Sequence, residues 1–218
     1  MKQNKHPKNI ESFIQEQIKT LMSSMYFTLI SIIQAGVIGY LFFVIDNNWY
    51  NISSTHIILI IITFLMVVTT WHEYMMGGMT FKFIPGLEDS LIPFLLGFSE
   101  FFVVRTIFSD LYQWYFALAI FCFVGWLAYF NMFHKSKVSQ YTENAIILER
   151  LGSLPIVTEV WSFSMVMGFA FFGLITYQFA SNLTIQYVTL SFSVIQWGAF
   201  LGRAILYWKR IVGDESSF

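Results

Sequence analysis

The sequence predicts an all-α fold: a polytopic integral membrane bundle of six transmembrane helices, arranged as three hairpins, with both termini in the cytoplasm. Three observations predict it. Hydrophobic residues make up 56% of the 218 residues and charged residues only 11%, whereas soluble domains average about 25% charged residues. Several apolar stretches approach the roughly 20 residues that a helix needs to cross a bilayer. Basic residues also gather in alternate loops, as the positive-inside rule requires.

The chain begins with a polar segment, residues 1–21, in which apolar residues recur at helical spacing from Ile10 to Leu21. We expect a cytoplasmic amphipathic helix here. It either binds the membrane surface or a partner protein, or it simply extends the first span. No secretory leader pattern precedes the first apolar run, so we expect that span to be retained.

Six apolar stretches are candidate membrane spans. Five contain few charges, whereas the third stretch contains Glu100 and Arg105. A re-entrant helix is the alternative for this third stretch. The spans are expected at about 22–45, 56–71, 91–108, 112–133, 160–180 and 185–207, which together form a transmembrane domain over 22–207.

The basic residues decide whether residues 91–108 cross the membrane. If they do, all twelve lysines and arginines except Arg105 lie on the side of the N-terminus. If they do not, the basic segment that begins at Lys135 moves to the opposite side and the bias is lost. We therefore predict six spans, a cytoplasmic loop at 134–159 and a cytoplasmic tail at 208–218. Within the loop, residues 142–152 have an amphipathic pattern that ends at Gly152, a favourable C-cap residue.

Glu100 lies roughly 15 Å from the inner end of the third span, close to the middle of the bilayer. An isolated charge there costs on the order of 3 kcal/mol. We expect this side chain to face the bundle interior, where a neutral carboxyl group can donate a hydrogen bond or carry a proton. Pro93, Gly97 and Val104 share its helical face, and Gly97 would let another helix approach closely. The alternative is that Glu100 only fixes helix packing through a hydrogen bond.

Other charged residues lie near the ends of the predicted spans. Arg105 is expected to reach the outer surface or to pair with Asp110 or Asp46. At the inner end, Arg203 is expected to pair with Glu159 or Asp89 and so form an inner gate. Glu73 lies at a similar depth. Ser90 is expected to cap the third helix, which would place Pro93 in its first turn.

A polar stripe follows one face of the last span: Gln186, Thr189, Ser193, Gln196 and Arg203. In a bilayer such a stripe must face protein or water. It is typical of a water-lined path shared by several helices, or of ordinary hydrogen bonding between helices. Similar stripes occur in the first span (Ser24, Thr28, Ser31, Gln34) and in the fifth (Ser164, Gly168, Gln178).

Catalytic and cofactor motifs are not recognisable. The four histidines are scattered and the chain has one cysteine, Cys122, so the sequence predicts no metal site, no cofactor and no catalytic group. His72 and Glu73 lack the second histidine of a zinc motif. The formal net charge of −1 provides no field that would attract nucleic acid.

The function predicted from these patterns is a channel or small transporter subunit, homo-oligomeric, in the plasma (inner) membrane of a prokaryote. Glu100 would be the selectivity or proton-sensing group, and Ser193 and Gln196 would be pore or interface contacts. A second hypothesis is a membrane scaffold or sensor that recruits a cytoplasmic partner through residues 134–159 and the N-terminal helix. A third, less favoured, is an intramembrane enzyme that acts on lipid.

Overall fold

The computed structural model describes residues 10–82, 86–139 and 141–212, with side chains from residue 27 to residue 211 of these ranges. Regular structure in these ranges is entirely helical, so the predicted all-α class is confirmed. Five of the helices, α1, α2, α4, α6 and α7, are long and apolar enough to span a membrane. The elements are α1 (Ile10–Asn47), η1 (Trp49–Asn51), α2 (Ser54–Thr80), α3 (Leu87–Arg105), α4 (Leu111–Val138), α5 (Thr142–Leu151), α6 (Leu154–Gln178) and α7 (Leu183–Val212).

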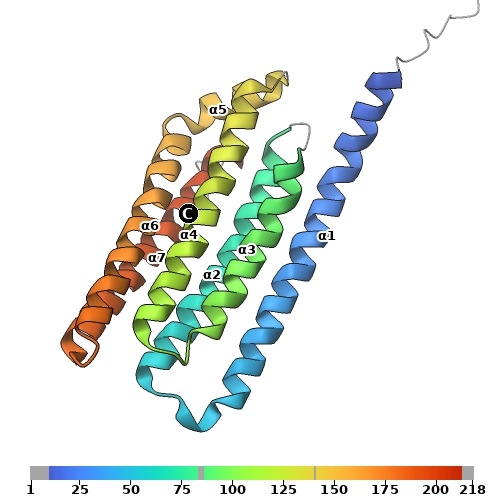
Figure 1. Cartoon of the computed structure of the whole chain (residues 1–218). Coiled ribbons are helices and arrows are strands. Elements are labelled where there is room, and N and C mark those ends of the chain that lie inside the picture. Colours follow the sequence, from blue (N-terminus) through green and yellow to red (C-terminus); the bar gives the residue numbers. More distant parts are fainter. Residues whose placement is uncertain (1–9, 83–85, 140, 213–218) are drawn as a thin grey trace, which may run out of the picture.

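The six long helices lie side by side and run alternately up and down, while the short helix α5 covers one end of the bundle (Figure 1). We call this the α5 end, and we call the opposite end, which holds the short helix η1, the η1 end. Helix α1 lies at the edge of the bundle against α2 and α3, and α4 packs most extensively against α6. Several helices extend past the predicted spans; α2, for example, continues to Thr80.

Helix α1 runs without a break from Ile10 to Asn47. This continuity agrees with the alternative in which the amphipathic N-terminal segment extends the first span. The side chains of residues 10–26 lie outside the described residues, as do residues 1–9 and most of the C-terminal tail.

Helix α3 runs through the bundle from the α5 end to the η1 end as one uninterrupted helix of 19 residues (Figure 1). The expectation that Ser90 caps it is wrong, because the helix begins at Leu87. The Asp89 carboxylate accepts a hydrogen bond from the Gly86 N–H at 2.6 Å and holds the first turn. Pro93 therefore lies inside the helix and not in its first turn.

The half of the bundle next to the η1 end is filled by large apolar side chains. Ile107, Trp114, Tyr115, Leu118 and Phe169 are all fully buried there. Aromatic rings occupy the space between α4 and α6, where Tyr115 stacks on Phe169 with ring centroids 6.3 Å apart. We call these five residues the aromatic plug, because they close this half of the bundle.

Helix α5 is amphipathic, as predicted, and its apolar face is already used within the chain. Ile147, Leu148 and Leu151 pack against a cluster formed by α2, α4, α6 and α7. Gly152 ends the helix with φ of 59°, a left-handed conformation that favours glycine. The Arg210 guanidinium donates to the Leu151 carbonyl oxygen at 2.9 Å and ties α7 to this turn.

Candidate functional site

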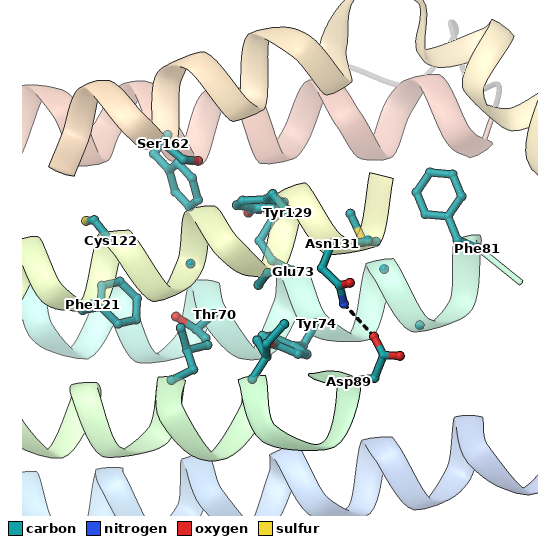
Figure 2. A pocket seen from close by; sticks show the side chains of 18 of the residues that line it. Thr70, Glu73, Tyr74, Phe81, Asp89, Phe121, Cys122, Tyr129, Asn131 and Ser162 are labelled. Atoms are coloured by element: carbon teal, nitrogen blue, oxygen red, sulfur yellow. Dashed lines mark hydrogen bonds between the residues drawn. The ribbon is translucent and has the colours of Figure 1, made fainter. Parts of the chain in front are cut away.

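A cavity of about 470 Å³ lies among α2, α3, α4, α6 and α7 in the half of the bundle next to the α5 end. Figure 2 shows Phe81 and Asp89 at one end of this cavity and Phe121 and Cys122 at the other. Most of its lining is apolar or aromatic, and its volume is in the range of small-molecule binding sites. Lys82, half exposed, also lines it at the α5 end, whereas the aromatic plug lies beyond its deep end.

A buried ion pair lies beside the cavity and joins α2 to α7. Arg203 Nη2 is 2.9 Å from Glu73 Oε1, and both side chains are less than a tenth exposed. The Tyr129 hydroxyl donates to Glu73 Oε2 at 2.8 Å and accepts from Arg203 Nη2 at 3.0 Å. Arg203 Nη1 also donates to Thr158 at 3.2 Å. This network of four residues connects α2, α4, α6 and α7, and it leaves both charges paired.

The expectation that Arg203 pairs with Glu159 or Asp89 is therefore wrong. Glu159 follows Thr158 on α6, so its side chain points about 100° away from the residue that contacts Arg203, and it is only half buried. Asp89 forms an ion pair with a lysine of α4 instead. The sequence placed these acids at one depth along the bundle, but it did not determine which helix faces they share.

Asp89 belongs to a second cluster, which joins α3 to α4 at the α5 end of the cavity. Its carboxylate accepts from Asn131 Nδ2 at 2.8 Å and forms an ion pair with Lys135. The Lys135 ammonium also contacts Glu88 at 2.6 Å. This contact lowers the pKa of Glu88, mainly through the hydrogen bond from Lys135. Asp89 is thus buried with its charge compensated.

Helix α5 holds the end of the cavity through Asn144, which is buried. Its side-chain amide accepts from the Lys82 N–H at 2.9 Å and donates to the Lys82 carbonyl oxygen at 2.6 Å. Lys82 Nζ also pairs with Glu143 at 2.9 Å. Because Lys82 lines the cavity, this clamp fixes the backbone at its mouth.

Glu100 does not line the cavity. It lies on the face of α3 that packs against α1, and it is fully buried. Its Oε2 accepts from Gln34 Nε2 at 2.8 Å, whereas its Oε1 has no hydrogen-bond partner within the described ranges. As predicted, Pro93, Gly97 and Val104 share this buried face. No lysine or arginine among the described residues forms an ion pair with Glu100.

Thr70 connects Glu100 to the cavity, because Thr70 lines the cavity and interacts with Glu100. The Thr70 hydroxyl also donates to the Met66 carbonyl oxygen at 2.9 Å. The Glu100 carboxyl group therefore lies next to a residue that lines the cavity.

The polar stripe of α7 faces inward, but its members differ in their surroundings. Ser193 is fully buried against the aromatic plug, where its hydroxyl is 3.3 Å from the Tyr115 hydroxyl. Gln196 is half buried and lies against Gly168 of α6. Neither residue lines the cavity.

Arg105 is exposed at the η1 end, and no ion pair of the described residues includes it. The expected pairs with Asp110 and Asp46 are therefore not formed. The stripe predicted for the fifth span is also wrong, because Ser164 and Gln178 are exposed. The buried polar residues of α6 are instead Thr158, Ser162 and Thr176.

Sequence reasoning missed Tyr129, Ser162 and Trp197, which line the cavity. The available signal for Ser162 was its helical spacing of four residues from Thr158 and seven from Phe169, both buried. The described residues contain no group of three or more histidine, cysteine, aspartate or glutamate side chains that could hold a metal ion.

Cys122, the single cysteine, can report access to the deep end of the cavity. We expect methyl methanethiosulfonate to modify it in the purified protein, and we expect the reaction to be several-fold slower in Gly125→Leu. Gly125 lines the cavity, and a Cβ atom there meets open space, so leucine would fill the passage. The rates can be followed by intact-protein mass spectrometry.

Gly198→Leu is the matched control, because Gly198 is exposed on α7 and a Cβ atom there also meets open space. Its reaction rate should equal that of the unmodified sequence. Equal rates in all three proteins would mean that reagents do not reach Cys122 through the cavity.

No protein-family model matches the chain, and neither a curated protein nor a solved structure matches it significantly. The site is therefore interpreted from its own geometry.

Proposed function

We propose that the protein is a proton-coupled carrier that moves a small uncharged solute across the membrane. The observation that carries this proposal is the cavity, whose lining residues lie in one half of the bundle and include none of the five residues of the aromatic plug. A channel needs a continuous path, whereas a carrier exposes its site to one side at a time. A cavity that ends within the bundle suits the carrier.

We further propose that α3 is the sixth span. Its 19 residues give a length of roughly 28 Å, close to the thickness of the hydrocarbon layer of about 30 Å. Its acidic groups lie either at the α5 end or buried against protein, as the bilayer requires. The described lysines and arginines other than Arg105 then lie toward the α5 end, which we place in the cytoplasm with both termini.

The solute is proposed to be uncharged because the charges around the cavity are already paired. Glu73 faces Arg203, and Asp89 faces Lys135. An ion in the deep end would lose its hydration without gaining a counter-charge. Residues of one chain line the cavity, so the proposal needs no second copy, although a homo-oligomer remains compatible with it.

Glu100 is proposed as the group that binds the proton. It is buried without a cation, and it interacts with Thr70 at the cavity wall. A carboxyl group in such surroundings can exchange a proton when solute or water reaches its neighbour. The alternative function, a scaffold that recruits a partner through α5, has less support because the apolar face of α5 is packed inside the chain.

The test is proton movement in liposomes that contain the purified protein and an entrapped pH dye. A pH gradient is imposed across the liposome membrane, and the uncharged probe acetophenone is then added. The probe should accelerate the decay of the pH gradient. Glu100→Gln should abolish this acceleration, because glutamine cannot exchange a proton, and Gly125→Leu should abolish it by filling the cavity. Gly198→Leu should behave like the unmodified protein.

Probe-dependent decay that is unchanged in Glu100→Gln, at equal incorporation, would remove Glu100 from the mechanism. Decay that occurs without any probe and persists in Gly125→Leu would indicate a proton leak outside the cavity. Either result would contradict the proposed carrier.

A further inference from the structure

Two hydrogen-bonding groups in the cavity wall have no hydrogen-bond partner among the described residues. They are the indole Nε1 of Trp197 on α7 and the hydroxyl oxygen of Ser162 on α6. Both residues line the cavity, and they are only 4% and 5% exposed. Buried polar groups are almost always hydrogen-bonded, so two unpartnered groups in one cavity wall indicate a site for a ligand.

Ser162 differs from the other serine and threonine residues of its helix. Thr158, Ser164 and Thr176 each donate to the carbonyl oxygen four residues earlier, at 2.8, 2.8 and 2.7 Å. This local bond is the usual way in which a helix satisfies a hydroxyl group. The Ser162 hydroxyl does not form it and has no hydrogen-bond partner among the described residues, while the residue itself lines the cavity. Figure 2 shows Ser162 on the wall opposite Thr70.

Trp197 cannot satisfy its N–H through its neighbours. The indole group is only a donor, and the rings that pack against it belong to Phe121 and Phe200, with centroids 6.5 and 5.5 Å away. These rings provide apolar surface and no acceptor atom. Arg203 Nε and the Tyr207 hydroxyl also lack hydrogen-bond partners in the described part of the chain, but neither residue lines the cavity.

We propose that the deep end of the cavity binds an uncharged, largely apolar molecule through one carbonyl oxygen, which accepts from both Trp197 and Ser162. A carbonyl oxygen has two lone pairs and can accept both bonds. Leu96, Phe121 and Met165 line the same cavity and would enclose the apolar part of the molecule. This inference rests on the proposed function, in which the cavity is the solute site.

The test compares two probes of similar size and shape in binding to the purified protein in nanodiscs. Acetophenone has the carbonyl oxygen, and isopropylbenzene replaces it with a methyl group. Equilibrium dialysis against empty nanodiscs corrects for partition into lipid. We expect acetophenone to bind about five- to thirty-fold more tightly than isopropylbenzene, the effect of one to two net hydrogen bonds.

Trp197→Phe and Ser162→Ala should each weaken acetophenone binding by about three-fold or more and leave isopropylbenzene binding unchanged. Ser164→Ala is the matched control, because Ser164 lies on the same helix, is exposed and bonds to its own helix. Circular dichroism and thermal unfolding should show that the three variants are folded.

Equal affinity for both probes, or acetophenone binding that is unchanged in both variants, would overturn the proposed carbonyl site and indicate a purely apolar cavity. No binding of either probe would overturn it as well. If the carbonyl selectivity is found but acetophenone moves no protons in liposomes, the ligand site stands and the carrier proposal fails. The two proposals can therefore fail separately.

Discussion

Replacing Arg203 with leucine is expected to lower the free energy of unfolding by about 3–5 kcal/mol. The substitution leaves the Glu73 carboxylate buried without the cation that lies 2.9 Å away. It also removes the donor to Tyr129 and Thr158. Unfolding in mixed micelles with increasing dodecyl sulfate, followed by far-UV circular dichroism, would measure the loss.

Two further variants separate the ion pair from the general effect of losing an arginine. The double variant Glu73→Gln/Arg203→Leu should recover most of the lost stability, because no unpaired charge remains. Arg105→Leu should change stability by less than about 0.5 kcal/mol, since Arg105 is exposed and forms no ion pair in the described part of the chain. If both arginine variants lost the same stability, the buried pair would not hold the helices together.

Replacing Gly97 with leucine is expected to separate α1 from α3. A Cβ atom at Gly97 would lie 2.3 Å from Ile33 Cγ2, which is closer than any real contact, and the leucine side chain extends further. Overpacking of this kind lowers the free energy of unfolding by about 1–3 kcal/mol or more. The shift should also break the bond between Gln34 and Glu100, so probe-dependent proton movement should fall together with stability.

Gly39→Leu is the control for this prediction, because Gly39 is an exposed glycine of α1 at which a Cβ atom meets open space. Adding Ile33→Ala to Gly97→Leu should restore part of the lost stability by removing the clashing branch. A Gly97→Leu protein as stable as Gly39→Leu would show that α1 does not depend on this close contact.

The features that could be predicted from the sequence are those that depend on one helix at a time. Helical spacing was enough to place Glu100, Gly97 and Pro93 on one buried face, and Gly152 at the end of an amphipathic helix. The apolar stretches also predicted five helices that are long and apolar enough to span a membrane. These properties follow from local periodicity and from the cost of exposing a polar group to lipid.

The features that could not be predicted depend on how two helices face each other. Arg203 was expected to pair with Glu159 or Asp89, whereas the packing of α2 against α7 brings it to Glu73. The cavity was not foreseeable for the same reason. Its two unpartnered groups belong to Trp197 and Ser162, which lie on different helices, so their spacing along the sequence does not place them in one cavity wall.

The pairing of the buried charges also bears on how the membrane potential would act on the protein. Arg203 and Asp89 each face an opposite charge, whereas Glu100 does not. In the proposed cycle, the proton on Glu100 is then the charge that crosses the bilayer, since the solute itself is neutral. Moving one such charge across a membrane potential of 100 mV changes its free energy by about 2.3 kcal/mol. Exchange of one inward proton for one outward solute would thus be electrogenic, and that potential alone would sustain a solute gradient of roughly fifty-fold.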